Sequence, residues 1–282
     1  MTATRIQTRS GLSLVADVEG AGAMTVILAH GGGQTRHSWR GLSAALVRHG
    51  YRVIRFDLRG HGESEWATDG DYFLPAMAED LTAVVDHAQG RVALVGASLG
   101  GLASFYALGS GIERRPVALA LVDIALRPAR DGTARVRAFM DAHPDGFASL
   151  EEAGDAVAGY SGRARPKSSD GLRRNLRQGA DGRWRWHWDP RFLRQADELV
   201  ERSHLLLSVA PAIPVPVRLL RGGESDMVTD EAVAEMAAAI PDFSVEVVAG
   251  AGHMVAGTAN DPYADAIVAF LKDVEASACV TP

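Results

Sequence analysis

A serine between two glycines lies in the run Val92–Gly101, VALVGASLGG. Gly96, Ser98 and Gly100 form the pattern Gly-x-Ser-x-Gly, directly after an apolar segment and directly before one with helical spacing. A nucleophilic serine at a sharp strand-to-helix turn needs small neighbours, because its own backbone is strained and adjacent segments press close. The N-terminus of the following helix also offers free N–H groups to a developing negative charge. The pattern in this context predicts Ser98 as a nucleophile for acyl transfer.

A second glycine-rich turn, His30–Gly33, follows the apolar segment Ile27–Ala29. Acyl transfer requires two N–H donors aimed at the oxyanion. The amide of Leu99, next to the nucleophile, can supply one donor, and a backbone amide of this glycine loop can supply the other. A phosphate loop fits less well, because Gly-x4-Gly-Lys-Ser/Thr is absent.

The base is expected to be a histidine on a loop late in the chain. His253 follows the apolar segment Ser244–Val248 and is flanked by small residues. Of the nine histidines, it stands where the chain order Ser…Asp/Glu…His requires the base. His30 is a rival, but its place beside the glycine turn indicates that it shapes that loop.

Two aspartates compete for the role of the acid that orients this histidine. Asp226 lies on a loop after the apolar segment Val217–Leu220, and Asp123 follows the segment after the nucleophile. Either carboxylate could hold the imidazole tautomer and stabilise the imidazolium. We favour Asp226 for its position in the chain order, with Asp123 second and Glu224 a poorer third.

These residues follow short apolar segments that alternate with segments of helical spacing. The segments rich in Val, Ile and Leu predict buried strands at Thr25–Ala29, Tyr51–Phe56, Arg91–Val95, Val117–Ile124, Val217–Leu220 and Ser244–Val248. Helices are predicted at Trp39–Arg48, Phe73–His87, Ser98–Leu108, Thr229–Ala239 and Pro262–Val274. Arg5–Gln7 and Leu12–Val18 predict an antiparallel hairpin at the sheet edge. The alternation indicates an α/β protein with a mostly parallel sheet covered by helices on both faces.

The segment Arg127–Leu207 interrupts this alternation and shows no buried-strand pattern. About eighty residues exceed an ordinary connection, so we expect an inserted unit built of helices. Its tryptophans Trp184, Trp186 and Trp188, with Phe192, either line a pocket or, as we favour, pack the insertion internally. The arginines Arg163, Arg165, Arg173, Arg174 and Arg177 are expected to form a solvated helix face. His187 has no partner at metal-binding spacing, so we do not expect it to be a ligand.

Composition narrows the class of protein. The 282 residues are 47% hydrophobic and 23% charged, which is typical of a globular protein. The single cysteine, Cys279, excludes a disulfide framework and a multi-cysteine metal site. A net charge of −6 argues against nucleic acid as a partner, and no segment is long and apolar enough for a membrane span. Met1–Gly11 lacks an apolar run typical of a secretory signal, so we expect a cytoplasmic protein.

The chain resembles the α/β-hydrolase superfamily over almost its whole length. The resemblance is carried, in the family's order and spacing, by His30–Gly33, the DLRGHGES loop Asp57–Ser64, Gly96–Gly100, Gly223–Asp226 and Gly252–His253. It implies an eight-stranded sheet in a core of residues 1–126 and 208–282, with residues 127–207 as a cap over the pocket. It also implies that Gly32 and Leu99 form the oxyanion hole.

Within the superfamily the chain is similar to esterases, non-haem haloperoxidases and epoxide-hydrolase-like proteins. Epoxide hydrolases and haloalkane dehalogenases use an aspartate nucleophile, and Ser98 in that position argues against both activities. The expectation is a hydrolase without cofactor or metal, acting on a small, largely apolar carboxylic ester, lactone or thioester. A carbon–carbon bond hydrolase with the same triad and a non-catalytic small-molecule receptor are the alternatives. The oligomeric state, monomer or homodimer, is left open.

Overall fold

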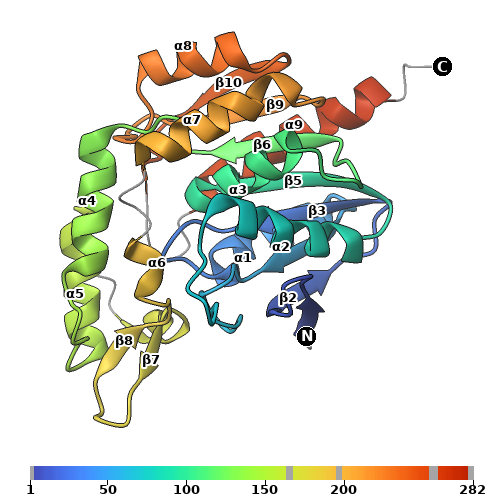
Figure 1. Ribbon diagram of the computed structural model, residues 1–282. Helices are drawn as coiled ribbons and strands as arrows, with labels where there is room; N and C mark the ends of the chain where they lie inside the picture. The colour runs from blue at the N-terminus through green and yellow to red at the C-terminus, as the bar shows by residue number, and fades with distance from the viewer. Residues whose placement is uncertain (1–2, 163–167, 195–198, 254–259, 279–282) are drawn as a thin grey trace.

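The computed structural model describes residues 3–162, 168–194, 199–253 and 260–278. Cys279 and the arginines Arg163 and Arg165 therefore lie outside the described residues. Eight strands form the central sheet (Figure 1): β1 (Thr4–Gln7), β2 (Ser13–Glu19), β3 (Met24–Ala29), β4 (Arg52–Phe56), β5 (Arg91–Ala97), β6 (Ala118–Val122), β9 (Val217–Gly222) and β10 (Phe243–Val248).

The strands follow the order β1-β2-β4-β3-β5-β6-β9-β10. The pairs β1–β2 and β2–β4 are antiparallel, and the pairs from β4 to β10 are parallel. This confirms the predicted mostly parallel sheet with an antiparallel hairpin at its edge. The chain leaves β3 toward one edge and returns to add β5 on the other side of β3, so the carboxyl ends of β3 and β5 flank a topological switch point. Ligands of open parallel sheets bind at such a point.

Helices cover both faces of the sheet because its strands are apolar on both sides. In β3, Ile27 and Ala29 pack into one core cluster, whereas Val26 and Leu28 pack into the other. The first cluster is covered by α2 (Leu74–His87), α3 (Ser98–Gly109), α7 (Leu199–Val209) and α8 (Asp230–Ala239), and the second by α1 (Arg40–Arg48) and α9 (Ala264–Ala278) (Figure 1). In the described part of the chain, no helix combines the length and apolarity that a membrane crossing requires.

Between β6 and α7 the chain builds the insertion. It contains α4 (Arg130–Asp141), α5 (Leu150–Ser161), β7 (Leu176–Gln178), β8 (Trp184–Trp186) and α6 (Arg191–Arg194) (Figure 1). The expectation of helices alone was wrong, because β7 and β8 pair as a small antiparallel sheet. Trp186 and Trp188 stack on each other in a separate apolar cluster of the insertion, which confirms that they pack internally.

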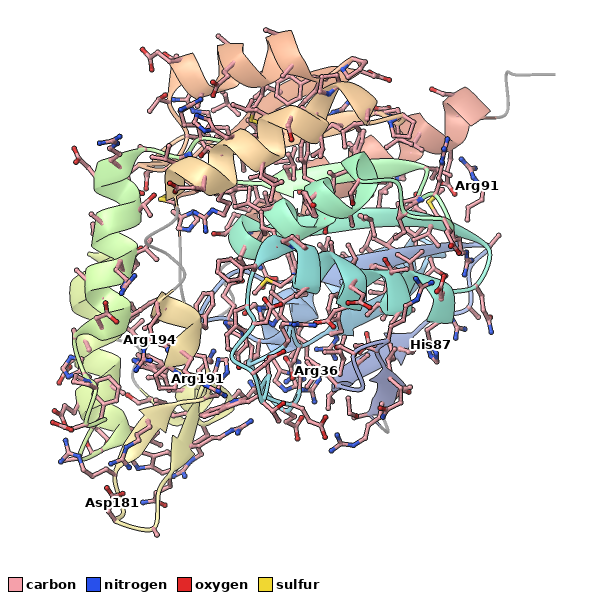
Figure 2. All side chains as sticks on the ribbon, viewed as in Figure 1. Arg36, His87, Arg91, Asp181, Arg191 and Arg194 are labelled. Atoms are coloured by element: carbon pink, nitrogen blue, oxygen red, sulfur yellow. The ribbon has the colours of Figure 1, made fainter. Side chains whose placement is uncertain are left out.

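The predicted cap boundary at 207 stays a prediction. Leu206 of α7 is fully buried in the same core cluster as α3, so this helix packs on the sheet domain. The insertion itself is fastened to the core at one visible point. The guanidinium of Arg191 donates to the carbonyls of Ala67 and Thr68 and to the Asp189 carboxylate (Figure 2).

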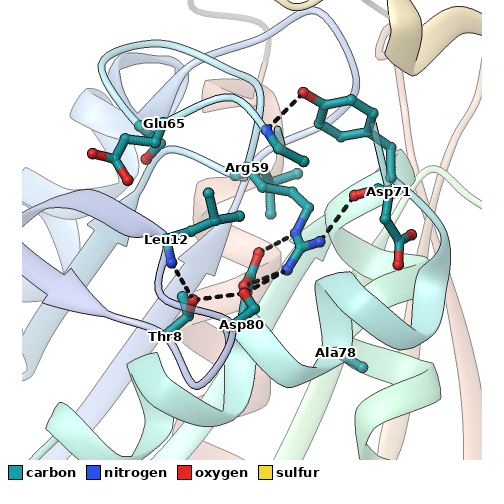
Figure 3. Close-up of polar contacts among 12 residues, drawn as sticks. Thr8, Leu12, Arg59, Glu65, Asp71, Ala78 and Asp80 are labelled. Atoms are coloured by element: carbon teal, nitrogen blue, oxygen red, sulfur yellow. Dashed lines mark hydrogen bonds and ion pairs between the residues drawn. The ribbon is translucent and has the colours of Figure 1, made fainter. Parts of the chain in front are cut away.

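Buried ion pairs fix the loop Asp57–Ser64 that follows β4. Arg59 donates from Nε and Nη2 to the Asp80 carboxylate of α2, at 2.5 and 2.7 Å, and from Nη1 to the carbonyl of Asp71 (Figure 3). Arg36 makes a second buried network with Asp17, Asp57 and Glu63. These pairs neutralise charges that would otherwise be costly to bury, and they hold the loop against the end of β3.

Candidate active site

Ser98 stands at the junction of β5 and α3, where the sequence predicts a nucleophile. Its backbone has φ 44°, a left-handed conformation that residues with a Cβ rarely adopt. Strain of this kind costs of order 1–3 kcal/mol and persists only where the surroundings over-determine it. The side chain is partly exposed and borders the largest cavity of the described residues. The turn therefore presents the hydroxyl to a ligand at the N-terminus of a helix.

The glycines around Ser98 are required by close approach of the backbone. A Cβ on Gly100 would lie 2.5 Å from the carbonyl oxygens of Ala29 and His30. A Cβ on Gly96 would lie 2.5 Å from the Cα of Gly101. The amide of Gly100 donates to the carbonyl of His30 at 3.1 Å, which ties the turn after β5 to the loop after β3. The small neighbours predicted from the sequence thus let the two loops of the site touch.

His253 pairs with Asp123. The imidazole Nδ1 lies 3.2 Å from Oδ2 of Asp123, and the other carboxylate oxygen accepts from the amide of Gly222 at 2.8 Å. Both residues are buried, with exposed fractions of 8% for His253 and 3% for Asp123. Asp123 is the second non-glycine residue with positive φ, at 47°. His253, Asp123 and Ser98 also border one small cavity beneath the main one, so the three side chains meet.

The preference for Asp226 as the partner of His253 was wrong. Asp226 binds Arg135 of α4 at 2.9 Å, and both side chains are substantially exposed, at 34% and 53%. Both aspartates follow a neighbouring strand and both lie between Ser98 and His253 in the chain, so chain order could not separate them. The turn after β6 decides between them, because it directs the Asp123 carboxylate toward the loop that carries His253.

The polar groups of the glycine turn are almost all engaged. Gln34 Oε1 accepts from the amide of Gly31 at 3.1 Å, and His61 Nε2 accepts from the amide of Gly33 at 3.3 Å. The Gly32 amide has no acceptor among the described residues, and Gly32 borders the cavity beside Leu99 and Ser98. Leu99 is the second residue of α3, so its amide has no acceptor within the helix. These two amides are therefore available at the cavity.

Three neutral histidines hold this turn from behind. His30 Nδ1 lies 2.8 Å from the carbonyl of Gly31 while its Nε2 accepts from the amide of Leu58. His61 accepts from Gly33, and His187 Nε2 lies 3.3 Å from the carbonyl of Gly33 while its Nδ1 accepts from the amide of Gly62. Since each ring accepts from one N–H, each must be neutral with its other nitrogen donating.

Burial explains why these rings stay neutral. It lowers the pKa of His30 to about 4 and that of His61 to about 3, and it lowers the pKa of His187 well below its usual value. The expectation that His30 shapes the glycine loop is confirmed by these contacts. Sequence reasoning missed His61 and His187. His61 lies in the DLRGHGES motif, which offered a signal, whereas His187 arrives from the insertion and nothing near it in the sequence pointed to the loop.

The main cavity has a volume of about 380 Å³ and lies between the sheet domain and the insertion. Most of its lining is apolar and includes Leu102, Ile124, Val136, Met140 and Leu205. Phe192 borders it and packs edge-on against His61. No group of three or more His, Cys, Asp or Glu with metal-binding geometry occurs in the described ranges.

Comparison with known proteins agrees with this fold and site. Residues 26–266 match the model of the alpha/beta hydrolase family, and the chain belongs to this family. It is 32% identical over 245 residues to the esterase Rv0045c of Mycobacterium tuberculosis, covering 84% of this chain and 78% of that protein. It is 30% identical over 257 residues to the 3-hydroxybutyrate-oligomer hydrolase of Cupriavidus necator, covering 86% of each.

A solved structure of the M. tuberculosis esterase aligns with a TM-score of 0.72 at 26% identity, over 97% of this chain and 91% of that one. The protein is therefore a hydrolase of the esterase branch of the family.

Proposed function

We propose that the protein hydrolyses a small carboxylic ester through an acyl-enzyme on Ser98. His253 acts as the base, Asp123 orients it, and the amides of Gly32 and Leu99 form the oxyanion hole. The observation that carries the proposal is the strained, cavity-facing Ser98 in the same pocket as a histidine that is bonded to a buried carboxylate. The apolar lining and the modest volume of the cavity support a small substrate with a largely apolar body.

The roles follow from the geometry. Asp123 accepts the proton-bearing Nδ1 of His253, which leaves Nε2 as the acceptor for the hydroxyl proton of Ser98. Ser98 Oγ attacks the carbonyl carbon, and the two amides stabilise the negative oxygen of the tetrahedral intermediate. His253 then returns the proton to the leaving alcohol as the carbon–oxygen bond breaks. Water, deprotonated by the same imidazole, attacks the acyl-enzyme and releases the acid.

The test is covalent labelling followed by turnover. A fluorophosphonate probe is expected to label Ser98 in the intact protein, as located by mass spectrometry of the digested chain. Labelling should be lost in Ser98→Ala and strongly slowed in His253→Ala, while Ser104→Ala, a buried serine on the same helix, should label normally. Hydrolysis of p-nitrophenyl acetate and butyrate should disappear in Ser98→Ala. Full activity of Ser98→Ala on every ester tested would falsify the proposal.

A further inference from the structure

One arginine of the main cavity carries a charge that the protein does not balance. Arg202 lies in the first turns of α7 and borders the cavity together with Leu205, one turn further along the same helix. Its Nε is shielded from solvent and has no hydrogen-bond partner within the described residues. The cavity is apolar around it, with Leu193, Leu205 and Met227 in its lining.

The other buried arginines show what is missing. Arg36 and Arg59 are each held by carboxylates, and these partners raise the pKa of both guanidinium groups despite burial. For Arg202, burial alone acts and lowers the pKa. A guanidinium remains protonated even so, so Arg202 places a positive charge in a low-dielectric cavity. Burying an unpaired charge is costly, and the cost is relieved when an anion binds.

The neighbouring charged groups do not fill this role. Arg137 of α4 also borders the cavity, but it pairs with Asp141 on its own helix. Glu201 borders the cavity as well, with an exposed side chain, and consecutive residues of a helix do not face each other. The exposed pair Arg135–Asp226 satisfies its own charges.

We infer that Arg202 binds a carboxylate of the substrate, so that the preferred substrates are esters with an apolar body and a free carboxylate at the end away from the scissile bond. This inference rests on the proposed function, because it assigns a specificity residue to the site of Ser98. A guanidinium matches a carboxylate with two parallel hydrogen bonds, and such charge-assisted bonds are about twice as strong as neutral ones. The apolar lining between Ser98 and Arg202 suits the methylene chain of such a molecule.

The experiment compares two ester probes that differ in one charge. The first is p-nitrophenyl hydrogen adipate, and the second is the p-nitrophenyl ester of adipic acid monoamide, which has the same length and no charge. A second pair, 6-acetoxyhexanoate and 6-acetoxyhexanamide, carries the charge on the alcohol side. Values of kcat/KM are measured for the wild type, for Arg202→Met, for Arg202→Lys and for the control Arg194→Met. Arg194 is an exposed residue of α6 outside the cavity lining, so its replacement changes the net charge equally (Figure 2).

The wild type is expected to prefer the carboxylate in at least one probe pair. Arg202→Met should lower kcat/KM for that acid roughly 10- to 100-fold, the range for loss of a hydrogen bond between charged groups. Activity on the amide should change less than about threefold, which shows that the variant is folded. Arg202→Lys should recover part of the preference, and Arg194→Met should keep it. The inference is overturned if the wild type shows no preference for either acid, or if Arg202→Met retains it.

Failure of the proposed function would look different. If Ser98 turns over none of these esters, binding of adipate itself is measured by titration calorimetry on the wild type and on Arg202→Met. Binding that is lost in the variant supports the anion site independently of turnover, and absence of binding to the wild type overturns it.

Discussion

Replacing Asp123 with asparagine removes a charge from the most closed part of the site without changing the shape of the side chain. Asp123 serves two donors at once: Oδ2 lies 3.2 Å from His253 Nδ1, and Oδ1 accepts from the amide of Gly222 at 2.8 Å. An asparagine has one oxygen acceptor and one NH₂ donor. If its oxygen keeps the Gly222 amide, its NH₂ group faces Nδ1, which must then be the unprotonated nitrogen. The proton moves to Nε2, where it blocks acceptance of the Ser98 proton.

The size of the loss follows from this tautomer argument. In serine proteases, the corresponding change lowers kcat by about 10⁴ through the wrong tautomer. Because the side chains of His253 and Asp123 are only 5% and 4% exposed, water cannot restore the lost charge, and we expect a fall of about 10³ to 10⁴. That range corresponds to about 4–5 kcal/mol in activation free energy. The Asp226→Asn control removes one exposed ion pair with Arg135, worth about 0–1 kcal/mol, so its kcat should fall by less than about fivefold.

The assay is steady-state hydrolysis of p-nitrophenyl butyrate at pH 7.5, with thermal melting of each variant to confirm that it is folded. The reasoning is refuted if Asp226→Asn loses three orders of magnitude in kcat while Asp123→Asn stays within tenfold of the wild type. A uniform loss of labelling by the fluorophosphonate in Asp123→Asn, with its melting temperature retained, would support the tautomer explanation.

The buried histidines and the buried ion pair give two more predictions. Because burial lowers the pKa of His30 from 6.5 to about 4, the unfolded chain binds more protons than the folded one in that window, and the free energy of unfolding should fall as pH falls through it, by about 3 kcal/mol from His30 alone. Urea unfolding at pH 7 and pH 4 measures this, and equal midpoints would contradict it. Asp80→Ala leaves the Arg59 guanidinium buried without its carboxylate and should cost about 3–5 kcal/mol in thermal or urea unfolding. The double variant Arg59→Met, Asp80→Leu should recover most of that loss, and a double variant no more stable than Asp80→Ala would contradict the argument.

The local pattern of the sequence carried most of the fold and the centre of the site. Apolar segments such as β3 and β5 are buried on both faces, and this composition distinguishes inner parallel strands from an edge hairpin. Ser98 was identifiable because its chemistry needs glycines within two residues, so the signal is local. Gly32 and Leu99 were also placed at the cavity as expected, since each lies in the turn that directly follows a predicted strand.

The sequence by itself therefore determined the class of fold, the serine turn, the glycine loop and the late histidine, because each is encoded within a few adjacent residues. Only the tertiary structure decided which aspartate meets His253, since Asp123 and Asp226 follow neighbouring strands and differ in the direction that each turn gives the carboxylate. The same holds for His187 and Arg202. Both come from segments more than sixty residues after Ser98, and their environment arises only when these segments fold against the loops of the sheet. Burial and pairing are properties of that packing, and no local pattern records them.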